Sequence, residues 1–508
     1  MTGVPARLRR AVTSRDRIVE AVADLLDRGY RCLLVGAENA GGRGVDGVQV
    51  GYLFARPAPV EDRVELVVDV PADDMWIPSV AAISYPAGRF ERGVHDLFGV
   101  RPRDHPLPRR LVRHAHWPSG WYPLRTDAGP APRFAPDVSA FPFVEVSGEG
   151  VYEIPVGPVH AGLIEPGHFR FSVVGETIIR MKARLWYLHR GVERLFEGRR
   201  PAEGLELAER ISGDTAVGHA LAFAMACEEA LDVEVAAPDR LLRALLLELE
   251  RLHNHVADLG AVFNDVAFGI AHAHTQRLRE TLLRLNACVT GHRLLRGGLR
   301  IGGTQVLELP DPEVVAGVAA EAGEVVRLAL DHPMVRDRLT GTAVLRRDDA
   351  ARIGVLGYVA RASGVDVDAR RDHPFADLAP TLAVPVEDAG DVLARVSVRA
   401  RELGTSAALV RDLVDRLAGS TGTPAGRADD GVDVPEGAAR GVGLVEAWRG
   451  LLCHRVALDG AGRLARVTVV DPSFMTWPGL AVALEGTIVP DFPLANKSFN
   501  QSYAGNDL

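Results

Sequence analysis

The chain has 508 residues, of which 47% are hydrophobic and 25% charged, and a formal net charge of −9. This composition is typical of a globular protein with two or three cores, and without a basic stripe it argues against nucleic acid as a partner. The sequence contains no apolar run of about 18 residues and no apolar N-terminal segment, so we expect neither a membrane span nor an export signal. We therefore expect a cytoplasmic protein that reaches a membrane only through partner subunits.

The first part of the chain has the pattern of a small α+β domain, which we place at residues 1–128. The expected helices cover residues 15–30 and 88–100, and the expected strands cover residues 31–37, 48–56 and 64–70. The next segment, 129–150, is rich in Pro and Ala and has no periodicity, which is typical of a linker.

The remaining residues, 151–508, are expected to form a mainly helical domain. Residues 151–175 look β-rich, long helical segments are expected from about Glu176 to Gly298, and residues 450–471 have the pattern of a C-terminal hairpin with a Gly-Ala-Gly turn. The overall fold class is α+β.

A helix expected near residues 239–266 carries two stripes. One is apolar, and the other contains Glu248, Arg251, His255 and Asp258. The polar stripe is either a buried charge relay or a solvated or inter-helix ion-pair face, and ordinary helix pairing favours the second. His253 and His255 are two residues apart on this helix, so we do not expect them to share a metal.

Cysteine usage is sparse. The four cysteines are far apart and form no CxxC pair, so neither a disulfide framework nor a thiolate metal site is expected. Each should be a small buried core residue. The residues concerned are Cys32, Cys227, Cys288 and Cys453.

Several segments together resemble one family. "ERGVHDLFGV", "DHPLPRRLV" and "HWPSGWYPLRTD" resemble the small hydrophilic subunit of respiratory complex I and its relative in formate hydrogenlyase. "VGPVHAGLIEPGHFRF", "LHRGVERLFEG", "ERISGDTAVGHALAFAMACEEA", "ELERLHNHVADLG", "RETLLRLNACVTGHRLLRGG" and "RASGVDVDARRDHPF" resemble the large subunit of complex I and of membrane-bound [NiFe] hydrogenases. The resemblance covers nearly the whole chain, in the fused order of the formate hydrogenlyase large subunit.

The resemblance locates the positions of a nickel site. Hydrogenases hold nickel and iron with cysteines in an RxCGxC and a DPCxxC segment, because anionic sulfur stabilises these soft metals. Here the segments read "ERISGDT" and "DPSFMT", which place Ser212, Thr215, Ser473 and Thr476 at the four positions, and Gly479 stands where a histidine would follow. Hydroxyls are poor ligands for such metals, so nickel and other bound metals are not expected.

Complex I binds a quinone head group between a histidine and a tyrosine in the same pocket. In this chain His160 matches the first histidine of the loop, Ile164 falls at the second, and Gly213 falls at the tyrosine. A quinone remains a possible ligand of the pocket, but it would need other hydrogen-bond partners.

Several polar residues remain for proton chemistry. If the segment from Ser212 is helical, Ser212, Thr215 and His219 share a face, and His219 matches a hydrogenase pocket histidine. Glu165 resembles the hydrogenase glutamate that passes protons to the metal site; a relay with a raised pKa and a structural carboxylate at a turn are both open. A pair between Lys497 and an aspartate, Asp471 or Asp491, is also expected to line the pocket.

The resemblance implies a large subunit of a membrane-associated oxidoreductase complex that couples electron transfer to ion movement without nickel. Its implied partners are an iron–sulfur small subunit, a ferredoxin-like subunit and antiporter-like membrane subunits, with the clusters held by partners and the complex on the inner face of the cell membrane. Two alternatives stay open: a true formate hydrogenlyase or [NiFe] hydrogenase subunit, and a non-catalytic assembly scaffold.

Overall fold

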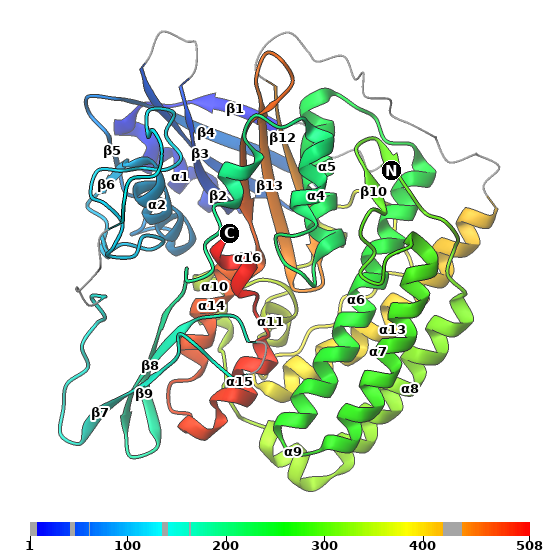
Figure 1. Cartoon of the computed structure of the whole chain (residues 1–508). Helices are drawn as coiled ribbons and strands as arrows, with labels where there is room; N and C mark the ends of the chain where they lie inside the picture. Colours follow the sequence, from blue (N-terminus) through cyan, green and yellow to red (C-terminus); the bar gives the residue numbers. More distant parts are fainter. Residues whose placement is uncertain (1–7, 41–45, 60, 135–140, 162–163, 420–438) are drawn as a thin grey trace.

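The structure is a computed structural model, and it describes residues 8–40, 46–59, 61–134, 141–161, 164–419 and 439–508 (Figure 1). These residues form the mixed α and β fold that the sequence predicts. Residues 135–140 of the expected linker lie outside the described residues, and the boundaries at 128 and 150 remain predictions.

The N-terminal part is a four-stranded sheet with two helices. Its strand order is β1-β4-β3-β2, with β1 parallel to β4 and the other pairs antiparallel. The strands and helices are β1 (Leu8–Val12), β2 (Arg31–Asn39), β3 (Gly47–Arg56), β4 (Asp62–Pro71), α1 (Ile18–Asp27, after a 3₁₀ turn at Arg15–Arg17) and α2 (Tyr85–Phe98). A short parallel pair, β5 (Trp76–Pro78) and β6 (Arg101–Arg103), flanks α2. The predicted strands and both predicted helices of this region are confirmed; β1, β5 and β6 were not predicted.

The next sheet corrects one prediction. β7 (Val151–Val156), β8 (His168–Val174) and β9 (Thr177–Arg184) form an antiparallel sheet, so the chain after Glu176 is a strand and helices begin only at α3 (Val192–Phe196). The segment 177–184 has a β-branched start and pairs along its length with β8, and this tertiary pairing outweighs local helical preference.

Helices make up most of the remaining chain. The long helices α6, α7, α8 and α13 lie side by side, and α6 contacts both α7 and α13 (Figure 1). The bounds are α4 (Pro201–Ala208), α5 (Ala216–Leu231), α6 (Ala237–Asp265), α7 (Gly269–Thr290), α8 (Pro312–Asp331), α9 (Pro333–Leu339), α10 (Arg347–Ile353), α11 (Gly357–Ala362), α12 (Ala369–Asp372) and α13 (Val392–Ala418), with a two-residue strand pair at β10 (Leu299–Arg300) and β11 (Gly303–Thr304).

The predicted C-terminal hairpin is confirmed as β13 (Gly450–Leu458) and β14 (Leu464–Val470), and β12 (Arg440–Ala447) adds a third strand. Helix α5 packs directly on β12, where glycine is required: a Cβ at Gly443 would lie 1.9 Å from the Ala222 carbonyl oxygen. The chain then continues through α14 (Pro472–Ala483), a 3₁₀ turn (Val489–Asp491), α15 (Phe492–Phe499) and α16 (Tyr503–Asp507).

The two parts of the chain share one hydrophobic core. Val442, Leu444 and Val470 of the C-terminal sheet pack into the cluster that holds β2, β3 and β4. Across the same seam the buried Arg455 donates from Nε to Glu65 at 2.7 Å and from Nη1 to Glu38 at 3.2 Å. The hydrophobic core of the N-terminal sheet is therefore completed by residues from the far end of the chain.

The polar stripe of α6 is buried, which corrects the expectation of a solvated face. Glu248, Arg251 and His255 are each at most 1% exposed. The inter-helix ion-pair alternative is confirmed, because Asp258 pairs with Arg399 of α13 at 3.2 Å. His255 contacts Glu402 of the same helix at 2.6 Å. His253 instead contacts the Leu249 carbonyl oxygen at 3.1 Å, so the two histidines have different partners.

The cysteines follow the prediction in part. Cys227 and Cys453 are buried and Cys32 is partly buried, but Cys288 is exposed on α7. No helix within the described ranges is both long enough and apolar enough to cross a bilayer.

Candidate functional site

Three serines meet where the two motif segments come together. Ser212 Oγ lies 2.8 Å from Ser502 Oγ, although the two residues are 290 positions apart. Ser473 Oγ accepts a hydrogen bond from the Ser502 backbone N–H at 2.9 Å, and Ser502 Oγ accepts one from Gly505 N–H at 2.8 Å. We call these three residues the serine cluster; each is at most 6% exposed. Residues of the C-terminal segment thus fill the space between the motifs.

The turn between Ser212 and α5 is organised by Asp214. Ser212 Oγ donates to Asp214 Oδ1 at 2.9 Å, and Thr215 Oγ1 donates to the same oxygen at 3.0 Å. Arg449, the last residue of the β12–β13 turn, donates to both carboxylate oxygens, at 2.6 and 2.7 Å. The partial burial of Asp214 opposes its ionisation, but these donors hold its pKa well below the ordinary value. Its side chain is 41% exposed, so this turn is the edge of the site that reaches solvent.

The expectation that the segment from Ser212 is helical is wrong. Helix α5 begins at Ala216, with Thr215 as its N-cap residue, and Ser212 lies in the preceding turn. Ser212 and Thr215 still converge, because both hydroxyls bind Asp214. His219 lies within α5, one helical turn after Thr215, and its ring contacts Asp471 and His454 of the C-terminal sheet region.

His219 lies in a buried chain of three polar side chains. Its Nε2 is 3.0 Å from Asp471 Oδ2, and its Nδ1 is 3.0 Å from Nε2 of His454 on β13. The three side chains are at most 1% exposed. Asp471 also caps α14 by accepting from Ser473 N–H at 2.7 Å. The three polar side chains therefore adjoin the serine cluster.

The hydrogen bonds imply the protonation pattern of this chain of residues. Burial lowers the pKa of His454, so its imidazole is neutral. Burial works against an ionised Asp471, but the hydrogen bond from His219 lowers its pKa overall. A proton on His219 Nε2 then donates to Asp471, and His219 Nδ1 accepts from His454, which assigns the tautomers by their partners. Such an arrangement can hold or pass a proton without solvent.

Glu165 is near the site but not in this chain of residues. Its Oε2 accepts from the Ala504 backbone N–H at 3.0 Å, which ties the β7–β8 loop to the segment that carries Ser502. This contact fits the structural alternative for Glu165, and the proton-relay alternative stays a prediction.

The other expected pocket residues lie elsewhere. His160 closes its own loop by a 2.8 Å contact to the Gly167 carbonyl oxygen, and Thr476 donates back to the Pro472 carbonyl oxygen of α14 at 2.9 Å. The expected Lys–Asp pair is wrong: Asp471 pairs with His219, Asp491 pairs with Arg338, and Lys497 acts electrostatically on Asp265.

Sequence reasoning missed four residues of the site: Asp214, Arg449, His454 and Ser502. Asp214 could have been noticed, because it stands between Ser212 and Thr215 in the motif. The other three carry no local signal, since the contacts of Ser502 with Ser212, of His454 with His219 and of Arg449 with Asp214 each span more than 230 positions.

The residues do not fit a nickel site. All four motif positions carry hydroxyls whose polar atoms already have protein partners. Nor do the described residues contain a group of three histidine, cysteine or acidic side chains placed to hold a metal. Soft metals require thiolates, and the cysteines of the chain lie outside these segments.

Comparisons with known proteins agree with this architecture. Residues 11–133 match the model of the respiratory-chain NADH dehydrogenase 30 Kd subunit, residues 190–259 that of nickel-dependent hydrogenase, and residues 265–429 that of the respiratory-chain NADH dehydrogenase 49 Kd subunit.

Individual relatives cover most of the chain. It is 32% identical to formate hydrogenlyase subunit 5 of Escherichia coli over 90% of this chain and 81% of that protein, and 32% identical to hydrogenase-4 component G of the same organism over 87% and 78%. Among solved structures, a chain of the membrane-bound sulfane sulfur reductase, an archaeal respiratory membrane complex, matches with 25% identity and a TM-score of 0.60 over 71% of this chain and 99% of that one.

These relatives are subunits of hydrogenase and respiratory complexes. The chain belongs to the family of large subunits shared by membrane-bound hydrogenases and complex I, as a fusion of the 30 Kd-type and 49 Kd-type subunits.

Proposed function

We propose that this chain is the nickel-free large subunit of a membrane-associated, complex I-like oxidoreductase that couples electron transfer to ion translocation. The observation that carries the nickel-free proposal is the serine cluster. Ser212 and Ser473, at two of the four nickel-ligand positions, are bridged by Ser502, and their hydroxyls are used within the protein. A soft metal there would have to break these hydrogen bonds and would gain only neutral oxygen ligands.

The electron carriers of such a complex would lie in other subunits. The partners we propose are an iron–sulfur small subunit, a ferredoxin-like subunit and antiporter-like membrane subunits, which would hold the complex at the inner face of the membrane. An aromatic cluster supports a docking surface. The tilted rings of His114 and Tyr187 have centroids 4.7 Å apart, and the edge-on rings of His116 and Phe134 have centroids 5.5 Å apart. Tyr187 and Phe134 are each 40% exposed.

The proton-handling residues we propose are His219 and Asp471, because they are paired, buried and adjacent to the serine cluster. Glu165 would extend this path only if the segment around Ala504 moves. A quinone remains a candidate acceptor; the loop of His160 would present it with partners other than the usual histidine and tyrosine pair.

The test is metal analysis of the complex purified through a tag on this chain, with hydrogen uptake assayed on the same sample. We expect iron in cluster amounts, no stoichiometric nickel and no hydrogen turnover, followed by reduction of a quinone or ferredoxin. Stoichiometric nickel with hydrogen turnover would overturn the proposal and favour a formate hydrogenlyase or [NiFe] hydrogenase subunit.

A second candidate is an assembly scaffold, and the burial of the site favours it. Because the side chains of His219, His454 and Asp471 are at most 1% exposed, a substrate could reach them only after a rearrangement. The variant His219→Gln separates the two roles. A redox subunit would lose turnover while the complex still assembles, whereas a scaffold would keep turnover as long as the complex assembles.

A further inference from the structure

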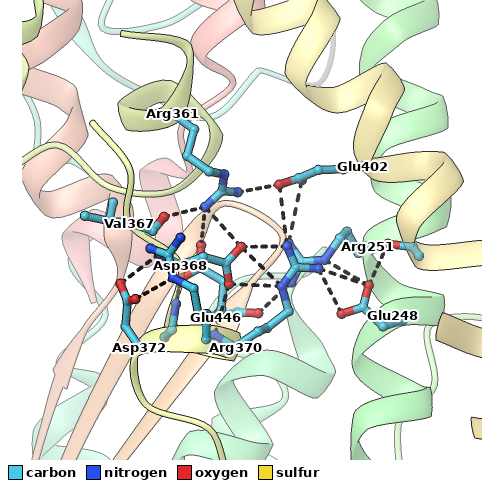
Figure 2. A network of polar contacts seen from close by, with 12 residues as sticks. Glu248, Arg251, Arg361, Val367, Asp368, Arg370, Asp372, Glu402 and Glu446 are labelled. Atoms are coloured by element: carbon cyan, nitrogen blue, oxygen red, sulfur yellow. Dashed lines mark hydrogen bonds and ion pairs between the residues drawn. The ribbon is translucent and has the colours of Figure 1, made fainter. Parts of the chain in front are cut away.

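A second buried polar network lies away from the serine cluster (Figure 2). It joins α6, α11, α12, α13 and β12, and every charged side chain in it is at most 4% exposed. Its cations are three guanidiniums, of Arg251, Arg361 and Arg370, and its carboxylates are four, of Glu248, Asp368, Glu402 and Glu446.

The contacts pair most of these charges tightly. Arg361 Nη2 donates to Glu402 at 2.5 Å, Arg370 Nη2 donates to Asp368 at 2.6 Å, and Arg251 Nε donates to Glu248 at 3.2 Å. Each guanidinium therefore already has a carboxylate of its own. Glu446 is the fourth carboxylate, without a cation of its own.

Asp368 and Glu446 share a single donor nitrogen. Arg361 Nη1 lies 2.9 Å from Glu446 Oε1 and 3.4 Å from Asp368 Oδ2, so one guanidinium edge faces both acids. The other oxygen of Glu446 accepts from the Ala369 backbone N–H at 3.0 Å. Two carboxylates this close, away from water, repel each other strongly when both are ionised.

The remaining titratable neighbours do not supply the missing charge. Asp372 accepts from the Asp368 backbone N–H at 3.1 Å, and it pairs with Arg371 at 2.9 Å. His255 contacts Glu402 at 2.6 Å, but burial lowers the pKa of His255 to about 4, so its imidazole is neutral near pH 7. With four ionised acids the network would carry one excess negative charge in the interior, which is costly. One bound proton removes that excess.

A cavity of about 610 Å³ adjoins the two acids. Glu446, Asp368 and Ala369 are among its lining residues, together with Asp372 and His373 at its polar side. Its opposite wall comes from the N-terminal part of the chain, including Tyr30 and Cys32. The cavity thus lies at the seam between the two parts of the fold and gives the acids a path to solvent water.

We propose that Asp368 and Glu446 form a proton-binding pair that holds one proton at neutral pH and exchanges it with water through this cavity. On release the O–H bond of the Glu446 carboxyl breaks, water takes the proton, and the electron pair stays on the carboxylate. This proposal goes beyond the proposed function, because it requires neither a nickel-free site nor any partner subunit.

The electrostatic environment agrees with this geometry. Burial and the charge of Asp368 raise the pKa of Glu446 to about 7, against the opposing effects of Arg361 and Arg251. Burial also opposes ionisation of Asp368, but Arg370 and Arg361 bring its pKa down to about 2. The two acids titrate as a pair, and the proton is held mainly on Glu446.

The test is infrared difference spectroscopy of the full chain at pH 6, which detects the carbonyl stretch of protonated carboxyl groups. We expect Glu446→Gln to remove one such band. Asp368→Asn should also remove it, although Glu446 is still present, because three guanidiniums then face three carboxylates and Glu446 ionises. The matched control Glu250→Gln should leave this band and remove a different one, since Glu250 is a buried acid in another site whose pKa is raised to about 8 mainly by burial.

The outcomes are distinct from those of the nickel test. A band that survives Asp368→Asn would show that burial alone protonates Glu446 and would overturn the pair. No band lost in Glu446→Gln would overturn the proposal altogether. If the Glu446→Gln and Asp368→Asn variants fail to fold, the double variant Glu250→Gln/Glu193→Gln is the alternative test. It leaves Asp368 and Glu446 intact and should retain a carboxyl band that disappears with a midpoint near pH 7. Its absence would contradict proton binding by the pair.

Discussion

Arg449 holds Asp214 with two parallel hydrogen bonds, 2.6 Å from Nη1 to Oδ1 and 2.7 Å from Nη2 to Oδ2. A third donor of the same guanidinium, Nε, binds the Asn500 carbonyl oxygen at 2.6 Å. One buried arginine thus fixes both the turn that carries Ser212 and the start of the C-terminal segment that carries Ser502. The geometry of the serine cluster depends on it.

Replacing Arg449 should therefore destabilise the protein. For Arg449→Ala we expect a loss of about 1.5–3 kcal/mol in the free energy of unfolding, because charged hydrogen bonds are removed while solvent partly compensates Asp214. Chemical denaturation measures the loss. Arg293→Ala, which removes an exposed pair with Glu280, is the control and should change little. Equal effects in both variants would contradict the role of Arg449.

The Asp471–His219 pair should give an acid-dependent contribution to stability. The pKa of Asp471 is lowered in the folded protein, so its contribution is present above about pH 4 and lost as the pH falls through the folded pKa. Compared with wild type, Asp471→Asn should be less stable at pH 7, and the difference should shrink below pH 4. Denaturation midpoints between pH 3 and 7 measure this. Asp415→Asn, at an exposed position on α13, should show no such convergence.

The serine cluster should behave as a coupled unit. In a double-mutant cycle of Ser212→Ala and Ser502→Ala we expect a coupling energy of about 0.5–1.5 kcal/mol, because each hydroxyl loses its partner in either single variant. Urea unfolding of the four proteins gives the value. Additive effects would mean that the 2.8 Å contact contributes nothing to stability.

Gly479 should not accept the histidine found at the corresponding hydrogenase position. A Cβ there would lie 3.0 Å from Val355 Cγ2 and 3.3 Å from Leu345 Cδ2, inside the packed core. For Gly479→Ala we expect folding with a lower melting temperature, whereas Gly479→His should fail to accumulate as folded protein. Gly460→Ala, whose Cβ meets no atom within 4 Å, is the control. A stable Gly479→His protein would show that this core can open.

The sequence anticipated much of the fold and part of the site. The strands at 31–37, 48–56 and 64–70 were found because their apolar runs are short and bounded by turn residues. The motif positions at Ser212 and Ser473 were found from the resemblance of their segments to the hydrogenase motifs. Contacts over long separations were not accessible. The pairing of His219 with Asp471, 252 positions away, depends on α5 packing against the C-terminal sheet.

Two errors have the same physical origin. Thr177–Arg184 forms a strand because β8 pairs with it, and Glu248 and Arg251 are buried because α13 and β12 cover them. Local periodicity reports which side chains share a face but not what covers that face. The expected pair between Lys497 and an aspartate of the site is wrong for the same reason. The cation that organises the site is Arg449, which reaches Asp214 through a long-range contact.

The seam between the two parts of the chain has a consequence for biosynthesis. The N-terminal sheet leaves the ribosome early, but the side chains that complete its core, Val442, Leu444 and Val470, are added near the end of translation. At about 5–20 residues per second, that delay is on the order of 20 to 80 seconds. During this time the part of the core that these three side chains fill stays open, so the nascent chain presents an apolar surface that chaperones can bind.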